Sequence, residues 1–230
     1  KPLDYSYLEK IIHNALDMLD KEQRNLEILK KSRPIMVDNF FHKLILSSSD
    51  EARFTLENYT DYLQLRYDYH CFQAIVIRIQ NASEIKENYG IEEYHIKLMS
   101  LSDTIDDLFR DRFSLVHTLT TFDEIVLLIG HNYPNQKSFY NISYELLEKL
   151  IHLYKNNFFE LNIGIGNIVK YLWSLSVSYS SALKSLEYRF FFPQKNIFTI
   201  SDTNDKDYSV ELYDISGTEE LIQLLCKNDL

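Results

Sequence analysis

Two adjacent carboxylates, Asp123 and Glu124, have the type and position that best fit a chemical role in this 230-residue chain. They stand between two short apolar runs, residues 113–119 and 124–129, which predict a β-hairpin that lacks the usual glycine in its turn. Paired carboxylates at such a turn can hold a divalent cation over a triphosphate if an adjacent strand supplies another carboxylate. The simpler alternative is that Asp123 and Glu124 only shape the turn.

The adjacent strand, expected near residues 71–80, carries Arg78 and Gln80 instead of a carboxylate. An arginine at the end of a buried strand is costly to leave unpaired. We therefore expect Arg78 to form an ion pair with Asp123 or Glu124, or to bind an anionic ligand. The candidate ligand cleft consists of Arg78, Thr121, Asp123 and Glu124.

Other kinds of chemistry find no pattern in the sequence. A phosphate-binding glycine loop is excluded because Gly164 and Gly166 are not followed by the further glycine or lysine that such loops need. The seven histidines are scattered without metal-ligand spacing, and no glycine elbow surrounds a serine. We predict no catalytic residue, no metal and no cofactor.

The composition restricts the partners and the compartment. Twenty-four basic residues against 34 acidic ones give a net charge of -10 and argue against nucleic-acid binding by this chain. Two cysteines without a pairing pattern fit a reducing compartment, and neither a membrane span nor a signal peptide is recognisable. These features predict a cytoplasmic protein. Because the chain starts without Met, we expect a fragment of a longer protein.

The first 31 residues predict a helix with a coiled-coil-like seam, interrupted at Glu22. This seam predicts weak pairing in a parallel homodimer. A kink or a restart is expected at Pro34, followed by helices near residues 35–46 and 51–65. The seam consists of Leu8, Ile12, Ala15, Leu19, Leu26 and Leu29.

From residue 71 the pattern predicts an α+β fold. Strands are expected at 71–80, 113–119, 124–129, 158–165 and 197–200, and helices at 91–109, 139–154 and 179–192. This order favours a mostly antiparallel sheet, as in ferredoxin-like palm domains. The predicted organisation is a helical connector of three helices at 1–66, an α+β domain at 67–202, and an acidic connector at 203–230 with a short helix near 218–226.

Several segments resemble one known family in the same order and spacing. The sequence TFDEI at 121–125 resembles a worn GGDEF motif, and residues 81–90 resemble the segment that follows the first strand in diguanylate cyclases. Residues 161–166, 178–189 and 194–197 resemble the middle domain of AraC-type two-component response regulators, whose centre is a degenerate GGDEF-like domain. The flanks resemble the end of a receiver domain, at 1–3, and the connector after it, at 25–32.

This resemblance implies a nucleotidyl-cyclase-like fold without the cyclase activity. The family's motif glycines fall on Thr121 and Phe122, its metal-binding aspartate falls on Arg78, and its inhibitory Arg-x-x-Asp motif falls on Arg112 and Leu115. An active cyclase would need a cation beside Arg78, which repels it.

The resemblance implies a regulatory region that couples receiver phosphorylation by a sensor kinase to a DNA-binding domain, both domains lying outside this chain. It leaves two further alternatives open. The worn cleft can serve as a sensor for a nucleotide or metabolite, and the first half of the N-terminal helix can pack on the receiver domain instead of pairing in a dimer.

Overall fold

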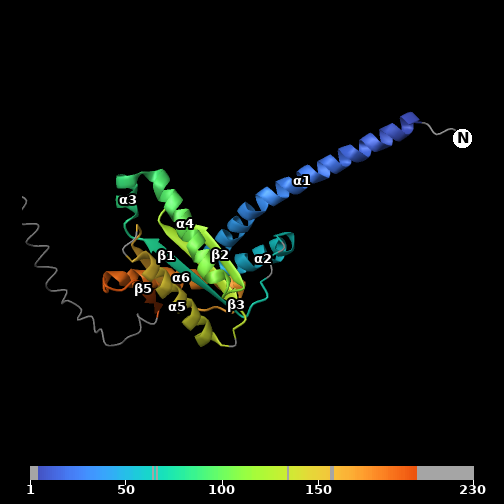
Figure 1. Cartoon of the computed structure of the whole chain (residues 1–230). Helices are drawn as coiled ribbons and strands as arrows, with labels where there is room; N and C mark the ends of the chain where they lie inside the picture. Colours follow the sequence, from blue (N-terminus) through green and yellow to red (C-terminus); the bar gives the residue numbers. More distant parts are fainter. Residues whose placement is uncertain (1–4, 64, 66, 134, 156–157, 201–230) are drawn as a thin grey trace, which may run out of the picture.

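The computed structural model describes residues 5–63, 65, 67–133, 135–155 and 158–200, and the side chains at 5–11, 25, 26, 28, 29 and 62 lie outside that description. Two helices, α1 (Tyr5–Leu46) and α2 (Ser49–Leu63), precede a mixed body of strands and helices (Figure 1). The body consists of β1 (Cys71–Ile79), α3 (Ala82–Tyr89), α4 (Ile91–Arg110), β2 (Leu115–Thr120), β3 (Glu124–His131), α5 (Gln136–Tyr154), β4 (Leu161–Ile165), α6 (Leu175–Glu187) and β5 (Ile197–Thr199), with 3-10 helices at Leu172–Ser174 and Tyr188–Phe190.

The strands form one five-stranded sheet in the order β2-β3-β1-β4-β5. Strand β1 lies at its centre and pairs antiparallel with both β3 and β4, whereas β4 and β5 are parallel. The mostly antiparallel α+β prediction is thereby confirmed. The helix α3 was not predicted as a separate element, because its eight residues carry only two buried side chains, Ala82 and Ile85.

Helices cover both faces of the sheet, and the alternation of β1 divides its side chains between two apolar clusters. Ile75 and Ile77 pack in the cluster that includes α4 and α5 residues. Ala74 and Val76 pack in the cluster of the opposite face, which includes residues of α1, α2 and α6. Burial on both faces explains why β1 is a nearly continuous apolar run.

Helix α1 continues through Pro34, so the expected restart there, and with it the prediction of three helices before residue 67, is wrong. A proline inside a helix removes one hydrogen bond and costs about 3 kcal/mol. The next turns more than offset this cost, since four buried side chains contribute about 1.5–3 kcal/mol each. These side chains are Phe40, Phe41, Leu44 and Ile45.

Residues 37–63 of the predicted connector pack against the sheet, because Phe41 and Leu56 share a cluster with Val76. The start of α2 is fixed by a reciprocal cap: Glu51 N–H donates to Ser48 Oγ at 3.4 Å, and Ser48 N–H donates to Glu51 Oε2 at 3.2 Å.

Helix α6 approaches β4 so closely that no side chain fits between them at Gly164. A Cβ atom there would lie 2.2 Å from the carbonyl oxygen of Ala182. Ser178 of α6 adds polar contacts to β1 and to the segment after β4: its Oγ accepts from Ala74 N–H at 2.8 Å and donates to Asn167 O at 2.6 Å.

Three predictions lie outside the described residues: the acidic connector at 203–230, its helix near 218–226, and the side-chain environment of Leu8, Leu26 and Leu29 in the seam. Within the described part of the chain, no helix is both long and apolar enough to cross a membrane.

Candidate functional site

The hairpin between β2 and β3 brings Glu124 opposite Arg78 of β1. The Arg78 guanidinium donates from Nε and Nη2 to Glu124 Oε1, at 2.8 and 2.5 Å. The two side chains are 40% and 22% exposed, so the pair lies at the boundary between core and water. The expected internal partner for Arg78 is thus confirmed, and it is Glu124.

The second carboxylate, Asp123, pairs with Lys86 of α3. The ammonium group of Lys86 also lies 4.5 Å from the centre of the Tyr94 ring. The contact between Lys86 and Asp123 was not predicted, because the two residues are 37 positions apart in the chain. The only signal for this contact was the family resemblance of residues 81–90, which places that segment beside the end of β1.

Tyr94 of α4 holds the β2–β3 turn in place from the buried side. Its side chain is fully buried, and its hydroxyl donates to the carbonyl oxygen of Phe122 at 2.7 Å. Burial, and then the negative charge of Asp123, raise the pKa of Tyr94. The phenol therefore stays protonated and acts as a hydrogen-bond donor.

Each carboxylate of the turn thus has its own cation, from β1 for Glu124 and from α3 for Asp123. Burial, and then Glu124, raise the pKa of the neighbouring Tyr179, while Arg78 opposes that effect. Within the described ranges, no group of three or more histidines, cysteines or carboxylates is placed to hold a metal ion. Chemically, the arrangement neutralises the turn and holds it in position.

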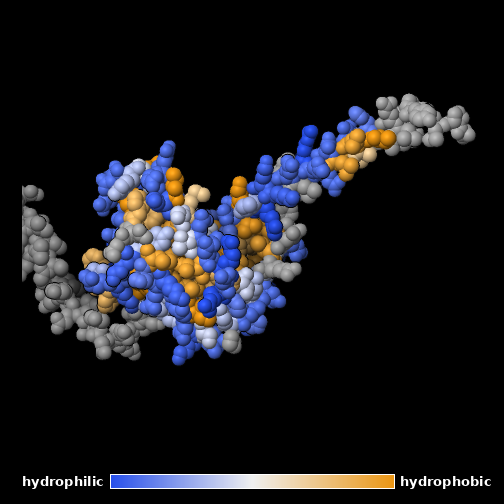
Figure 2. Space-filling model, viewed as in Figure 1, coloured by the Kyte–Doolittle hydropathy of each residue, from blue (hydrophilic) through white to orange (hydrophobic). Residues whose placement is uncertain are grey.

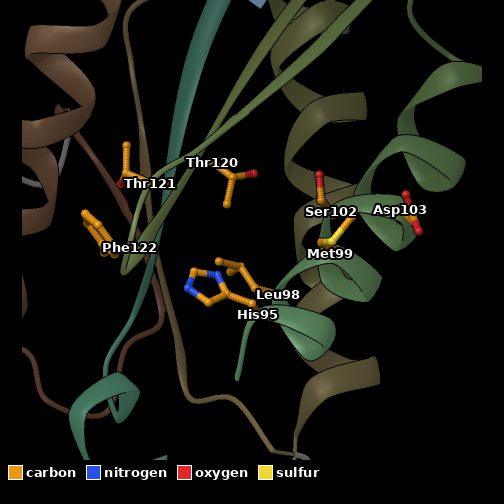
Figure 3. A pocket seen from close by; sticks show the side chains of 8 residues that line it. All are labelled: His95, Leu98, Met99, Ser102, Asp103, Thr120, Thr121 and Phe122. Carbon is orange, nitrogen blue, oxygen red and sulfur yellow. The ribbon is translucent and has the colours of Figure 1, made fainter. Parts of the chain in front are cut away.

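A cavity of about 660 Å³ lies beside the turn, between α4 and the end of the hairpin (Figure 3). In Figure 3, His95 and Leu98 of α4 lie across the cavity from Thr120 of β2. Of the predicted cleft residues, Thr121 lines this cavity, whereas Arg78, Asp123 and Glu124 are not among its lining residues. Sequence reasoning missed this space. Its lining consists of His95, Leu98, Met99, Ser102, Asp103, Thr120, Thr121 and Phe122.

The residues matched to the family's inhibitory motif lie elsewhere. Arg112 lines a separate cavity of about 480 Å³ after the end of α4, together with Arg110 and His131. Leu115, which stands at the motif's aspartate position, is a half-buried apolar residue of β2 and is not among that cavity's lining residues.

One family model and several solved structures are similar to this chain. The family model described as "GGDEF-like domain" matches residues 48–188. The active GGEEF domain of a diguanylate cyclase from Vibrio cholerae is similar in structure, with 12% identity, a TM-score of 0.43, and coverage of 61% of this chain and 85% of that one.

The S helix-GGDEF-EAL structure of Vibrio cholerae LapD bound to c-di-GMP is 13% identical, with a TM-score of 0.43, and covers 73% of this chain and 39% of that one. Among curated proteins, none matches this sequence.

Proposed function

We propose that this chain, which belongs to the GGDEF-like domain family, is a non-enzymatic regulatory region of a two-component transcriptional response regulator. It couples phosphorylation of a receiver domain to an AraC-type DNA-binding domain, with both domains outside this chain. The sensor kinase and DNA are then partners of those domains, and the protein works in the cytoplasm. The resemblance of the flanks at 1–3 and 25–32 supports this context.

The observation that carries the non-enzymatic role is the Arg78–Glu124 ion pair. Catalysis of phosphoryl transfer depends on cations that neutralise charge at the reacting phosphates. Here a fixed guanidinium occupies the carboxylate that a divalent cation would need, and it repels a second cation beside it. Thr121 and Phe122 add side chains where the family has glycines.

Incubation of the purified chain with GTP and Mg²⁺ or Mn²⁺ tests this role. We expect no cyclic dinucleotide above the enzyme-free background. Product that forms with the wild type and disappears in the Glu124→Gln variant would show that the turn is catalytic and would overturn the proposal. Product that persists in Glu124→Gln would point to a contaminating cyclase, which a second purification step removes.

The response-regulator context is tested separately by reading the coding sequence on both sides of this chain. We expect a receiver domain before Lys1 and a helix-turn-helix domain after Leu230. Their absence would overturn this context while leaving the non-enzymatic role of the domain intact.

A second candidate function, sensing of a nucleotide or metabolite, is favoured by the cavity of about 660 Å³ beside Thr121 and Phe122. Calorimetry against nucleotides and sugar phosphates tests it. Heat of binding that is lost when Thr120→Trp fills the cavity would establish a sensor. No heat at millimolar ligand would leave the signal-transmission role alone.

A further inference from the structure

The outer edge of β2 carries backbone groups that point away from the sheet. β2 is the first strand in the sheet order, so β3 is its only neighbour among the described strands. Thr121 N–H donates to Glu124 O at 2.8 Å, which makes Thr121 and Glu124 a hydrogen-bonded pair. Because such pairs alternate in an antiparallel ladder, His117 and Leu119 also bond to β3. The intervening residues Val116, Thr118 and Thr120 direct their N–H and C=O groups outward.

The cavity of Figure 3 continues this edge at its end, since Thr120 belongs to both. Its lining includes the apolar side chains of Leu98, Met99 and Phe122. Met99 is 70% exposed and Phe122 is 73% exposed, so two large apolar side chains stand open to water beside the free edge. An apolar side chain from an added strand would bury them.

Carboxylates flank the same edge on both sides. On α4, Asp103 lines the cavity, and Asp106 accepts a hydrogen bond from Thr118 Oγ1 at 2.7 Å while pairing with Arg110 at 3.1 Å. On α1, Asp38 is 56% exposed beside His117. Toward Thr118 and Thr120 the edge therefore favours a basic occupant, whereas Arg110 and Arg112 lie near Val116 at its other end. A second copy would bring the same acidic groups together, and residues 203–230 carry seven acidic residues against two basic ones.

We propose that the β2 edge docks an extended segment of another protein in which Lys or Arg alternates with apolar residues. The segment adds a strand by bonding to the outward groups of Val116, Thr118 and Thr120. Because successive side chains of a strand point to opposite faces of the sheet, its apolar side chains enter the cavity beside Leu98 and Met99, and its basic side chains face α1 and pair with Asp38. This interaction goes beyond the proposed signal transmission and does not depend on whether the turn is catalytic.

Amide hydrogen exchange measured by NMR tests the pairing residue by residue. The probe is a capped peptide of four Lys-Val repeats, added to the whole chain at low salt. We expect slower exchange at the amides of Val116, Thr118 and Thr120 and no change at His117 and Leu119, which already bond to β3. Uniform change along β2, or no change, would overturn the proposal.

Affinities for the labelled peptide then separate backbone pairing from charge. Thr118→Pro removes an outward N–H without breaking the β3 ladder, and we expect it and Asp38→Lys to weaken binding at least tenfold. Two controls accompany these variants. The Asp61→Lys variant, changed on α2, should bind the Lys-Val peptide as the wild type does. A Glu-Val peptide should bind the wild type at least tenfold more weakly than the Lys-Val peptide does.

Two results contradict the proposal. The first is equal binding by a folded Thr118→Pro variant, with Thr120→Pro tested alongside in case the first fails to fold. The second is slower exchange at the same amides when the chain alone is concentrated, which would make a second copy the occupant.

Discussion

The ion pair of Arg78 and Glu124 is partly open to water, and this exposure sets its contribution to stability. Side-chain exposures of 40% and 22% place the pair between a surface and a buried interaction. We expect the coupling energy between Arg78→Met and Glu124→Gln to be about 1 kcal/mol, because water screens the charges. Urea unfolding of the wild type, the two single variants and the double variant measures it.

The same measurement separates a structural pair from a binding site. If the turn were organised for an anion or a cation, one single variant would be more stable than the wild type, since an unfavourable charge would have been removed. A matched cycle at Arg53 and Glu57, an exposed pair of α2 at 3.4 Å, gives the value for an ordinary surface contact.

His117 gives the interface of α1 and β2 a pH dependence. It stacks on Phe41 at 4.3 Å, and Asp38 Oδ1 lies 2.9 Å from its Nε2. Burial lowers the pKa of His117, Asp38 and Asp106 oppose this effect, and His42 adds to it, with a net lowering. The unfolded chain then binds a proton more readily, so stability falls as the pH drops below about 6.5.

We expect His117→Gln to flatten the decrease in unfolding free energy between pH 7 and pH 5, measured by urea titration at each pH. Burial also lowers the pKa of His131, so part of the slope should remain until His131→Gln is added. Exposed His152 provides the control, and an equal flattening by His152→Gln would contradict this assignment.

Residue types predicted part of this site. Arg78 needed a carboxylate, and the hairpin register supplied Glu124. The contacts of Lys86 with Asp123 and of Asp38 with His117 were not predictable, because nothing in the local pattern indicates which distant segments meet. The cavity beside Thr120 was missed for the same reason: it depends on the spacing of α4 and the hairpin.

At the scale of elements, the contact between β4 and α6 depends on the absence of a side chain. In Gly164→Ala the new Cβ would lie 2.2 Å from Ala182 O and 2.7 Å from Leu186 Cγ. Because backbone must move to relieve the first contact, we expect a loss of about 3 kcal/mol or more in unfolding free energy. Thermal and urea denaturation measure this loss.

Gly130→Ala is the matched control within the same sheet. Its Cβ would meet the Phe72 ring at 3.0 Å and Leu115 Cβ at 3.3 Å, and side chains shift more easily than backbone. A loss at Gly130 as large as the loss at Gly164 would show that close approach of α6 is not the cause.

Apolar periodicity predicted most elements because it records which face each one buries. The run in β1 and the face of α4 with Tyr94, Leu98, Leu101 and Ile105 are examples. Pro34 misled the prediction because local propensity indicates a break, whereas packing of Phe41 and Leu44 on the sheet stabilises the continuous helix. The helix near residues 51–65 was predicted, and its start is fixed locally by the cap at Ser48.

At the scale of the whole molecule, α1 extends away from the body with apolar side chains on its outer part (Figures 1 and 2). Ile12 and Leu19 of the coiled-coil-like seam are 51% and 56% exposed, and Leu16 next to the seam is 53% exposed. We propose that this seam pairs with its counterpart in a weak parallel homodimer. Sedimentation over a concentration series should show self-association that decreases when Leu19 and Leu26 are both changed to Lys.

Weak pairing suits a switch, because receiver phosphorylation can shift a marginal equilibrium that a tight dimer would resist. Asn14→Lys, on the other side of the helix, should leave the association unchanged. A strictly monomeric wild type, or a dimer that persists in the double variant, would contradict the proposed pairing. Either result would favour packing of the first half of α1 on a receiver domain.

The uninterrupted course of α1 through Pro34 has a consequence for how a signal can reach the sheet. Forty-two helical residues form a helix about 63 Å long, in which each residue is rotated by about 100° around the helix axis relative to the one before it. Since Phe41 and Leu44 fix one end, one residue inserted near Asp20 would rotate everything before it by about 100°. Seven inserted residues would restore the orientation to within about 20°. The rotation of this part of α1 around its axis, rather than the length of the helix, then determines which of its sides faces a partner.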